Sequence, residues 1–409
     1  MNYRLLHDPV RLILRAVRHI ARMGFEEAGY WYGLLADRSM KAAHWSGTVE
    51  GTYLITTDRG VFLLTGSTVR RISRLPAFGI AISEDQQIYL ATWGPGRTTI
   101  VTAPLERVLA AKIRCWREIW QLPIANFAAR VHQISACENS LWLANTAENS
   151  LTRLDRKTGA WQATVAPFAC SFGHPIQTDH NHVNGVLARQ NYVVFSAFKI
   201  NRQAAFGVFG DGKLWLFSYP NMGVHDCVFD GTEFLFCDSY CFWQPQTHGA
   251  LYRAGENVFE DFFREAEASF LRGIAGNGSE TLVGNSYGGD RTKRFTGKCQ
   301  VFVLRNTDQT PQRLELPAAQ VYDIIRTDGE HFERSPANRT ASEVAENFEA
   351  IFGPPVLVTE LRDTLSGEHQ KRFDLRDVGH VEEYLITQKA PRDGGVDPVD
   401  TLPERSATC

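Results

Sequence analysis

The sequence predicts a six-bladed β-propeller, an all-β fold in which small sheets surround a central channel. Three observations predict it. A strand layout recurs about every fifty residues through the middle of the chain. The N-terminal part holds strands that the last repeat lacks. Polar residues recur at the start of the first strand of successive repeats, where packing alone would favour Val or Ile.

The repeat is clearest where a strand that starts at Val131 is followed by strands at 141–145 and 151–154. The same layout starts again at five other positions, namely 78–80, 183–185, 225–227, 272–274 and 322–324. The spacings of about 42 to 54 residues suit a four-stranded blade.

Both ends of the repeat region are incomplete. The last unit stops after one strand, and residues 53–57 and 61–64 are predicted to be the second and third strands of a blade without a first. Combining the two ends gives six complete blades over residues 46–330. This closure removes sheet edges that would invite aggregation.

Three segments lie outside the ring. Residues 1–45 hold a helix that begins at Asp8 and Pro9, with apolar residues on one face and arginines on the other. The apolar face of this helix packs on the propeller, or the helix lies on an anionic membrane surface or helps the protein dock on a partner. Residues 331–390 form an extension with a helix from 341 to 352, and 391–409 a disordered tail. A further helix is expected around 256–270.

Composition limits the function. The formal charge of −3 and the absence of a basic block argue against a nucleic-acid partner. No apolar run reaches about 18 residues and no signal peptide is evident, so a cytoplasmic location is expected. The eight cysteines are scattered without a CxxC pair. No phosphate-binding loop occurs, so no nucleotide cofactor is expected. A nucleophile elbow and an HExxH motif are also missing from the sequence.

Residues at equivalent strand starts of a propeller face a common centre, so the repeat alignment predicts two rings. The first ring contains His132, Val183, His225, Arg272 and Tyr322. The second contains Gln133, Asn184, Asp226, Gly273 and Asp323. His182 precedes the first ring and shares a strand face with Asn184, because side chains alternate along a strand.

These side chains are typical of two kinds of metal site. Asn184, Asp226 and Asp323 offer oxygen ligands for Ca²⁺ or Mg²⁺. The imidazoles of His132, His182 and His225 suit Mn²⁺, Fe²⁺ or Zn²⁺. Alternatively, the same groups hydrogen-bond one another and ordered water in a wet channel.

The motifs resemble the gluconolactonase, regucalcin and strictosidine-synthase superfamily of six-bladed propellers. Asn184-Gly185 resembles a metal-ligand asparagine of the lactonase branch, Asp226 its aspartate and general base, and Asp323 its acidic first ligand. His132 or Gln133 stands where the family has a second asparagine. The stretches VHQISACENSLWLANT, HNHVNG and VHDCVFDG are more similar to a bacterial propeller family without an established activity.

The function predicted on this basis is a metal-assisted enzyme for a small polar substrate, a lactone or ester hydrolase or a related lyase or isomerase. Asp226 or His225 would move the proton, and Arg272 or Lys199 would hold an anionic group. The alternative is a non-catalytic propeller that presents its loop face to a protein or glycan.

Overall fold

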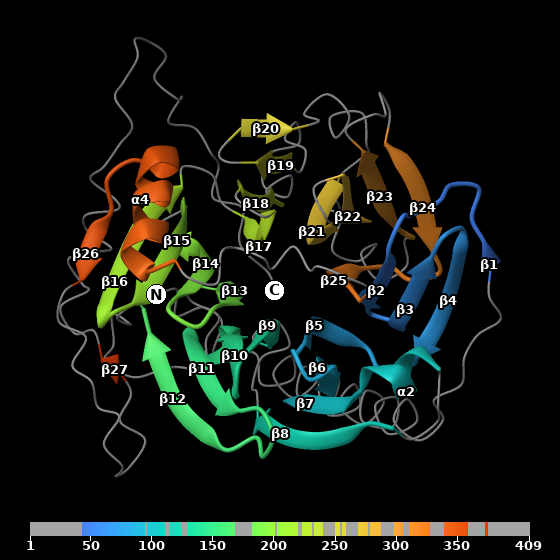
Figure 1. Ribbon diagram of the computed structural model, residues 1–409, viewed down its shortest axis with the longest axis horizontal. Coiled ribbons are helices and arrows are strands. Elements are labelled where there is room, and N and C mark those ends of the chain that lie inside the picture. Colours follow the sequence, from blue (N-terminus) through green and yellow to red (C-terminus); the bar gives the residue numbers. More distant parts are fainter. Residues whose placement is uncertain are drawn as a thin grey trace, which may run out of the picture.

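The computed structural model describes most of the strand-forming part of the chain. The described ranges are 43–94, 96–110, 115–123, 130–167, 182–200, 203–219, 223–230, 233–239, 250–253, 256–258, 269–276, 279–287, 298–305, 311–327, 339–358 and 373–374. Within them the strands form six sheets of four or five strands, set around one axis like the blades of a propeller (Figure 1). The predicted all-β propeller class is confirmed. The expected N-terminal helix and C-terminal tail lie outside the described residues.

In each sheet four antiparallel strands run outward from the axis, and residues 373–374 add a parallel strand to one of these sheets. The first three sheets in chain order contain β1 (Ala43–His44), β2 (Thr52–Thr57), β3 (Gly60–Thr65), β4 (Thr68–Ser73) and β25 (Val321–Arg326); β5 (Ala77–Ile82), β6 (Gln87–Gly94), β7 (Arg97–Pro104) and β8 (Arg117–Pro123); and β9 (Val131–Cys137), β10 (Ser140–Asn145), β11 (Ser150–Asp155), β12 (Trp161–Ala166) and β27 (Phe373–Asp374).

The other three contain β13 (Val183–Ala188), β14 (Val193–Ile200), β15 (Gln203–Gly210), β16 (Lys213–Tyr219) and β26 (Val356–Val358); β17 (Val224–Asp230), β18 (Glu233–Asp238), β19 (Ala250–Arg253) and β20 (Glu256–Val258); and β21 (Ser269–Gly276), β22 (Glu280–Tyr287), β23 (Cys299–Arg305) and β24 (Gln312–Leu316). Short helices are α2 (Leu105–Leu109) and η2 (Thr146–Glu148).

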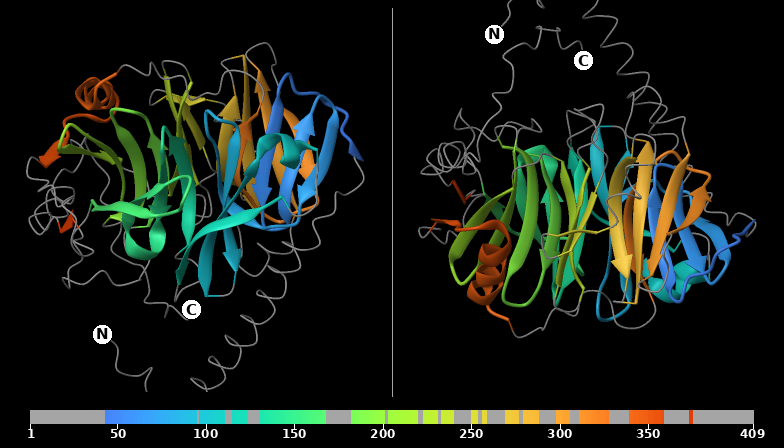
Figure 2. Two further views of the ribbon diagram at one scale, coloured as in Figure 1. Left: turned by 60° about the horizontal axis from the view of Figure 1, so that its bottom comes forward. Right: turned by 90° about the horizontal axis from the view of Figure 1, so that it is seen from above.

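The two ends of the propeller meet in one sheet. Strand β25 pairs with β2, with Ile55 opposite Ile324, so a C-terminal strand lies innermost in an N-terminal sheet. The innermost strands are therefore β5, β9, β13, β17, β21 and β25, and each contacts the next around the axis. Figure 2 shows the sheets edge-on, with their inner strands running along the axis.

Apolar side chains fill the spaces between adjacent sheets, which explains why both faces of most strands are apolar. One such cluster joins residues of β10 and β11 to β13–β16. Another extends outward to the C-terminal helix α4 (Ala341–Phe352), which packs on β15 and β16 through Val344 and Phe348. Helix α4 begins at a capping box of Thr340 and Glu343 and ends at Gly353, as the sequence predicts.

One expectation differs from the structure in the residues that are described. The insertion around 256–270 was expected to be helical, but its first residues form strand β20 and its last residues open β21; residues 259–268 lie outside the described residues. Strand β20 pairs with β19, so residues 256–258 are extended by edge pairing. Among the described residues, no helix has the length and apolar character to cross a membrane.

Candidate functional site

A β-bulge interrupts every innermost strand near its start. The pairing register shifts at Phe78–Gly79 in β5, at His132–Gln133 in β9, and at Asn184 in β13. It shifts again at three later positions, Asp226 in β17, Gly273 in β21 and Tyr322 in β25. A bulge breaks the alternation of side chains and redirects them. Consecutive residues at each strand start therefore contribute to different layers of the molecule.

The first layer is a closed ring with one side chain from each sheet, which we call the strand-start ring. Its members, in order around the axis, are Phe78, His132, His182, His225, Arg272 and Tyr322. Centroid distances between neighbouring rings are 5.0 Å from Phe78 to His132, 4.7 Å to His182 and 5.9 Å from there to His225. Arg272 Nη2 lies 2.8 Å from His225 Nε2, and its guanidinium carbon 5.9 Å from the Tyr322 ring centroid. Tyr322 and Phe78 close the ring at 4.3 Å.

The ring differs from the sequence prediction at two positions. Val183 is fully buried in an apolar cluster between sheets, and His182 takes the expected place of Val183. His182 has a positive φ of 51°, and its backbone N–H donates to Asn149 Oδ1, which turns its side chain toward the axis. Phe78 was not singled out, although the repeat alignment already placed it at the same position as His132.

Hydrogen bonds fix which nitrogen of two imidazoles carries the proton. The hydroxyl of Thr146 donates its single proton to the carbonyl of Val183 at 2.6 Å. Its oxygen therefore accepts in its contact with His132, so Nδ1 of His132 is protonated and Nε2 holds a lone pair when the ring is neutral. In the same way, His225 Nδ1 donates to the Gly223 carbonyl at 2.9 Å, and Nε2 accepts from Arg272.

The permanent charge of the ring is the guanidinium of Arg272. It is partly exposed, lies over the Phe270 ring at 4.6 Å and donates to His225. Burial, followed by the nearby charge of Arg272, holds the pKa of His225 well below its ordinary value. His225 therefore stays neutral and serves as an acceptor that orients Arg272. The sequence predicts that it moves a proton; in this structure its two ring nitrogens lie at hydrogen-bond distance from Gly223 and Arg272.

The next layer joins each sheet to its neighbour, and we call it the clamp layer. Gln133 Oε1 accepts from Val186 N–H at 2.8 Å, and Asn184 Nδ2 donates to the Val224 carbonyl at 2.6 Å. Asp226 Oδ2 accepts from Gly273 N–H at 2.7 Å, and Asp323 Oδ2 from Ile80 N–H at 3.1 Å. Each of these bonds runs from one innermost strand to the next. These predicted second-ring residues thus hold the ring of sheets together.

Glycine occupies the clamp layer where the backbones come closest. A Cβ built on Gly273 would lie 3.0 Å from the backbone of Asp323 and of Ile324, and the residue has a positive φ of 74°. A Cβ on Gly79 would lie 2.9 Å from the backbone of Gln133. No side chain fits between the strands at these two positions, so backbone contact replaces the polar clamp.

Hydroxyls at the ends of second strands form a further set of bonds between sheets. Thr56 donates to the Phe78 carbonyl and Ser286 to the Val321 carbonyl, while Thr146 and Ser239 make the corresponding bonds to Val183 and Leu271. Their contacts position the backbone from which the strand-start ring projects.

Asp226, expected as a general base, has a raised pKa. Its carboxylate is buried, and desolvation raises its pKa to about 6, despite the N–H of Gly273 and the charge of Arg272, which both lower it. One oxygen accepts from Gly273, and Gln133 Nε2 lies 3.5 Å from the other. The carboxylate faces sideways between strands, so its geometry fits a structural clamp.

The expected oxygen ligands Asn184, Asp226 and Asp323 do not converge on one point. The Oδ1 atom of Asn184 accepts from the Ser196 hydroxyl, and the oxygens of Asp226 and Asp323 accept from backbone N–H groups. A Ca²⁺ or Mg²⁺ site needs such oxygens to converge on one point, but here each faces a different strand. His225 uses both ring nitrogens. No group of three or more His, Cys, Asp or Glu in the described part of the chain is placed to hold a metal.

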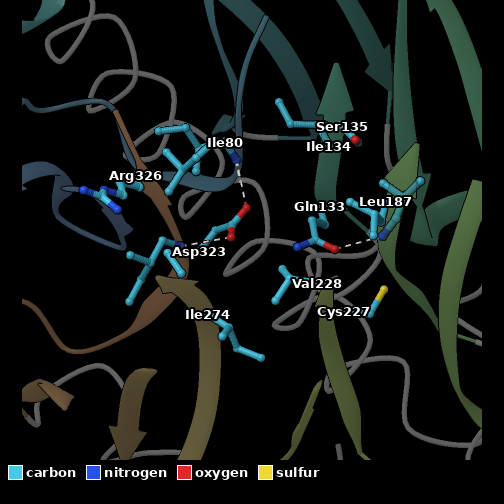
Figure 3. Close-up of a pocket in the computed structure, with 14 residues that line it drawn as sticks. Ile80, Gln133, Ile134, Ser135, Leu187, Cys227, Val228, Ile274, Asp323 and Arg326 are labelled. Carbon is cyan, nitrogen blue, oxygen red and sulfur yellow. Dashed lines mark hydrogen bonds between the residues drawn. The ribbon is translucent and has the colours of Figure 1, made fainter. Parts of the chain in front are cut away.

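A small cavity lies deeper along the axis, beyond the clamp layer. Its volume is about 40 Å³, room for one or two water molecules. Figure 3 shows Gln133 and Asp323 at its edge, with Ile274, Val228 and Cys227 on other sides. Apolar residues from the middle of the inner strands form most of its lining. Most polar and charged side chains near the axis thus lie at the strand starts.

Comparison with known proteins adds a likeness of fold. No protein-family model matches the chain, and no curated protein matches it. Among solved structures, a chain of a nidogen–laminin complex is 8% identical, with a TM-score of 0.46 over 67% of this chain and 97% of that one.

Two bacterial structures give similar values. A candidate 6-phosphogluconolactonase from Bacteroides uniformis is 12% identical, with a TM-score of 0.44 over 68% of this chain and 99% of that one. A virginiamycin B lyase from Staphylococcus aureus is 13% identical, with a TM-score of 0.38 over 71% and 81%. The function is therefore argued from the site itself.

Proposed function

We propose that the protein is an acid–base enzyme that binds the carboxylate of a small substrate at Arg272 and removes a proton from the adjacent carbon through His132. This is the chemistry of a lyase or isomerase. The proposal rests on one observation: the strand-start ring combines a permanently charged guanidinium with an imidazole whose Nδ1 is held by Thr146, which leaves Nε2 as its proton-accepting nitrogen.

The roles follow from charge. When a proton leaves the carbon beside a carboxylate, negative charge grows on the carboxylate oxygens, and a guanidinium that already holds them stabilises that charge. The Nε2 atom of His132 accepts the proton, and Thr146 keeps the acceptor nitrogen in place. The resulting imidazolium can return the proton to the carbon, so an exchange reaction needs no other reactant.

Proton exchange with solvent tests the proposal directly. The protein is incubated in D₂O with a panel of small carboxylic acids, and loss of the proton next to the carboxylate is followed by NMR. We expect Arg272→Gln and His132→Gln each to slow exchange by about 100-fold or more. Arg313→Gln and His44→Gln, which remove exposed residues of the same types, should leave the rate unchanged.

Two further measurements distinguish the proposed enzyme from a metal-assisted enzyme and from a hydrolase. A chelator should not alter exchange, and a loss that added Mg²⁺ or Mn²⁺ restores would favour the metal-assisted enzyme predicted from the sequence. Hydrolysis of lactones or esters without carbon-proton exchange would favour the hydrolase. A protein that neither exchanges nor hydrolyses any member of the panel, and binds none, would contradict the enzyme proposal in favour of a binding module.

A further inference from the structure

The strand-start ring has two chemically different sectors. Imidazoles come from the three consecutive sheets that contain β9, β13 and β17, and the guanidinium from the next sheet. The remaining two sheets contribute Tyr322 from β25 and Phe78 from β5. Trp93 of β6 extends this second sector, with its ring 5.5 Å from Phe78 and 6.2 Å from Tyr322. We call these three residues the aromatic sector.

The aromatic sector is held in place from outside. The guanidinium of Arg130, a fully buried side chain, lies 4.7 Å from the Trp93 ring and donates to the carbonyl of Gly94 in the same strand. The contacts of Phe78 with Trp93 and Tyr322 are tilted, at interplanar angles of 53° and 50°. Tilted contacts of this kind are among the arrangements that aromatic pairs prefer, and of the three rings that of Trp93 is the most exposed.

The order of residues around the axis links this sector to the proposed chemistry. Arg272 adjoins Tyr322 on one side of the sector, and His132 adjoins Phe78 on the other. A substrate with its carboxylate at Arg272 and its adjacent carbon facing His132 would have Tyr322 and Phe78 along one side.

From this arrangement, and resting on the function proposed above, we infer that the substrate is an arylalkyl carboxylate, an acid whose aromatic ring is one or two carbons from the carboxylate. Phe78, Trp93 and Tyr322 would be its specificity-determining residues. A polyhydroxylated sugar acid fits less well, because its hydroxyls would lose hydrogen bonds to water against three aromatic rings.

Calorimetric binding of matched acids tests this inference. The probes are 3-phenylpropanoate, 3-cyclohexylpropanoate, gluconate and the neutral 3-phenylpropanamide. We expect the phenyl acid to bind about 3- to 10-fold more tightly than the cyclohexyl acid, the range for an aromatic contact beyond its apolar area. Gluconate and the amide should bind more weakly still.

Variants locate the effect. Phe78→Leu should reduce the preference for the phenyl over the cyclohexyl acid to about 1, with thermal unfolding as the check that the protein is folded. Trp93→Leu, at a less buried position, gives a second measurement if Phe78→Leu does not fold. Trp161→Leu, which removes an exposed tryptophan of β12, should keep the preference.

The outcomes separate the two proposals. Equal binding of the phenyl and cyclohexyl acids, or tighter binding of gluconate, would overturn the aromatic substrate class while leaving the acid–base function intact if Arg272→Gln still weakens binding of all three acids. Binding that does not depend on Arg272 would overturn both.

Discussion

Adjacent residues of one strand serve different purposes in this propeller. His225 and Asp226 are neighbours in β17, yet His225 belongs to the strand-start ring and orients Arg272, while Asp226 belongs to the clamp layer and binds the backbone of β21. The same division separates His132 from Gln133 and Tyr322 from Asp323. The polar residues of the strand starts thus form two sets. One set can meet a ligand, and the other joins the sheets.

If this division is correct, changes in the clamp layer should lower stability most. Gly273→Ala adds a Cβ 3.0 Å from the backbone of β25 at a φ of 74°. We expect it to lower the free energy of unfolding by about 3–5 kcal/mol in urea denaturation. Gly212→Ala is the matched control, because it has a similar φ of 69° but no atom within 4 Å of the new Cβ. Equal losses in both variants would show that the close approach is unimportant.

Loss of a polar clamp should have the next largest effect. Asn184→Leu leaves the Val224 carbonyl and the Ser196 hydroxyl without their present partner. We expect a loss of about 2–3 kcal/mol in unfolding free energy, because two buried polar groups lose a bond. Binding of small carboxylic acids should survive under conditions in which the variant is folded. A stable variant that no longer binds would instead place Asn184 in the binding site.

Thr146→Val tests the hydroxyl that joins His132 of the strand-start ring to the next sheet. It removes the hydroxyl that joins His132 to the Val183 carbonyl, and we expect a loss of about 1–2 kcal/mol in unfolding free energy. Carbon-proton exchange should fall as well, since the acceptor nitrogen of His132 is no longer fixed. Thr146→Ser, which keeps the hydroxyl, should retain most of the exchange rate. A Val variant with the wild-type rate would contradict the role of Thr146.

The smallest predicted effect is a pH dependence from Asp226. Its pKa of about 6 in the folded protein exceeds the ordinary value of 3.8, so the folded state takes up this proton first as the pH falls. Protonation of this group therefore raises the free energy of unfolding by about 1 kcal/mol as the pH falls from 7 to 5. His225 acts in the opposite direction, because its lowered pKa makes the unfolded state bind a proton more readily below about pH 6.5.

The Asp226 contribution is isolated by comparing variants. The stability of the wild type relative to Asp226→Asn should rise by about 1 kcal/mol as the pH falls from 7 to 5, measured by urea denaturation at each pH. Asp211→Asn is a suitable control, since Asp211 is exposed and has a φ of 53°, close to the 49° of Asp226. A constant difference across this range would show that the carboxyl is ionised throughout.

Much of the fold could be predicted from local patterns. The recurring apolar strands indicated the propeller class, and helix α4 was predicted over residues 341–352, the bounds that the structure shows. The repeat alignment also placed His132, His225, Arg272 and Tyr322 at equivalent strand starts, and these four lie in one ring. Such features depend on residues close together in the chain, so the sequence contains the information.

The division of labour within each strand start was decided by tertiary structure. Simple alternation put His182 and Asn184 on one face, but the bulge at Asn184 turns its side chain toward Val224, forty residues along the chain. Likewise, Asp226 and Asp323 became clamps because their carboxylates meet backbone N–H groups of the next sheet. The sequence determined which polar groups gather at the axis. Only the packing of one sheet against the next decided which of them face the centre and which bind a neighbour, because that choice depends on contacts between distant segments.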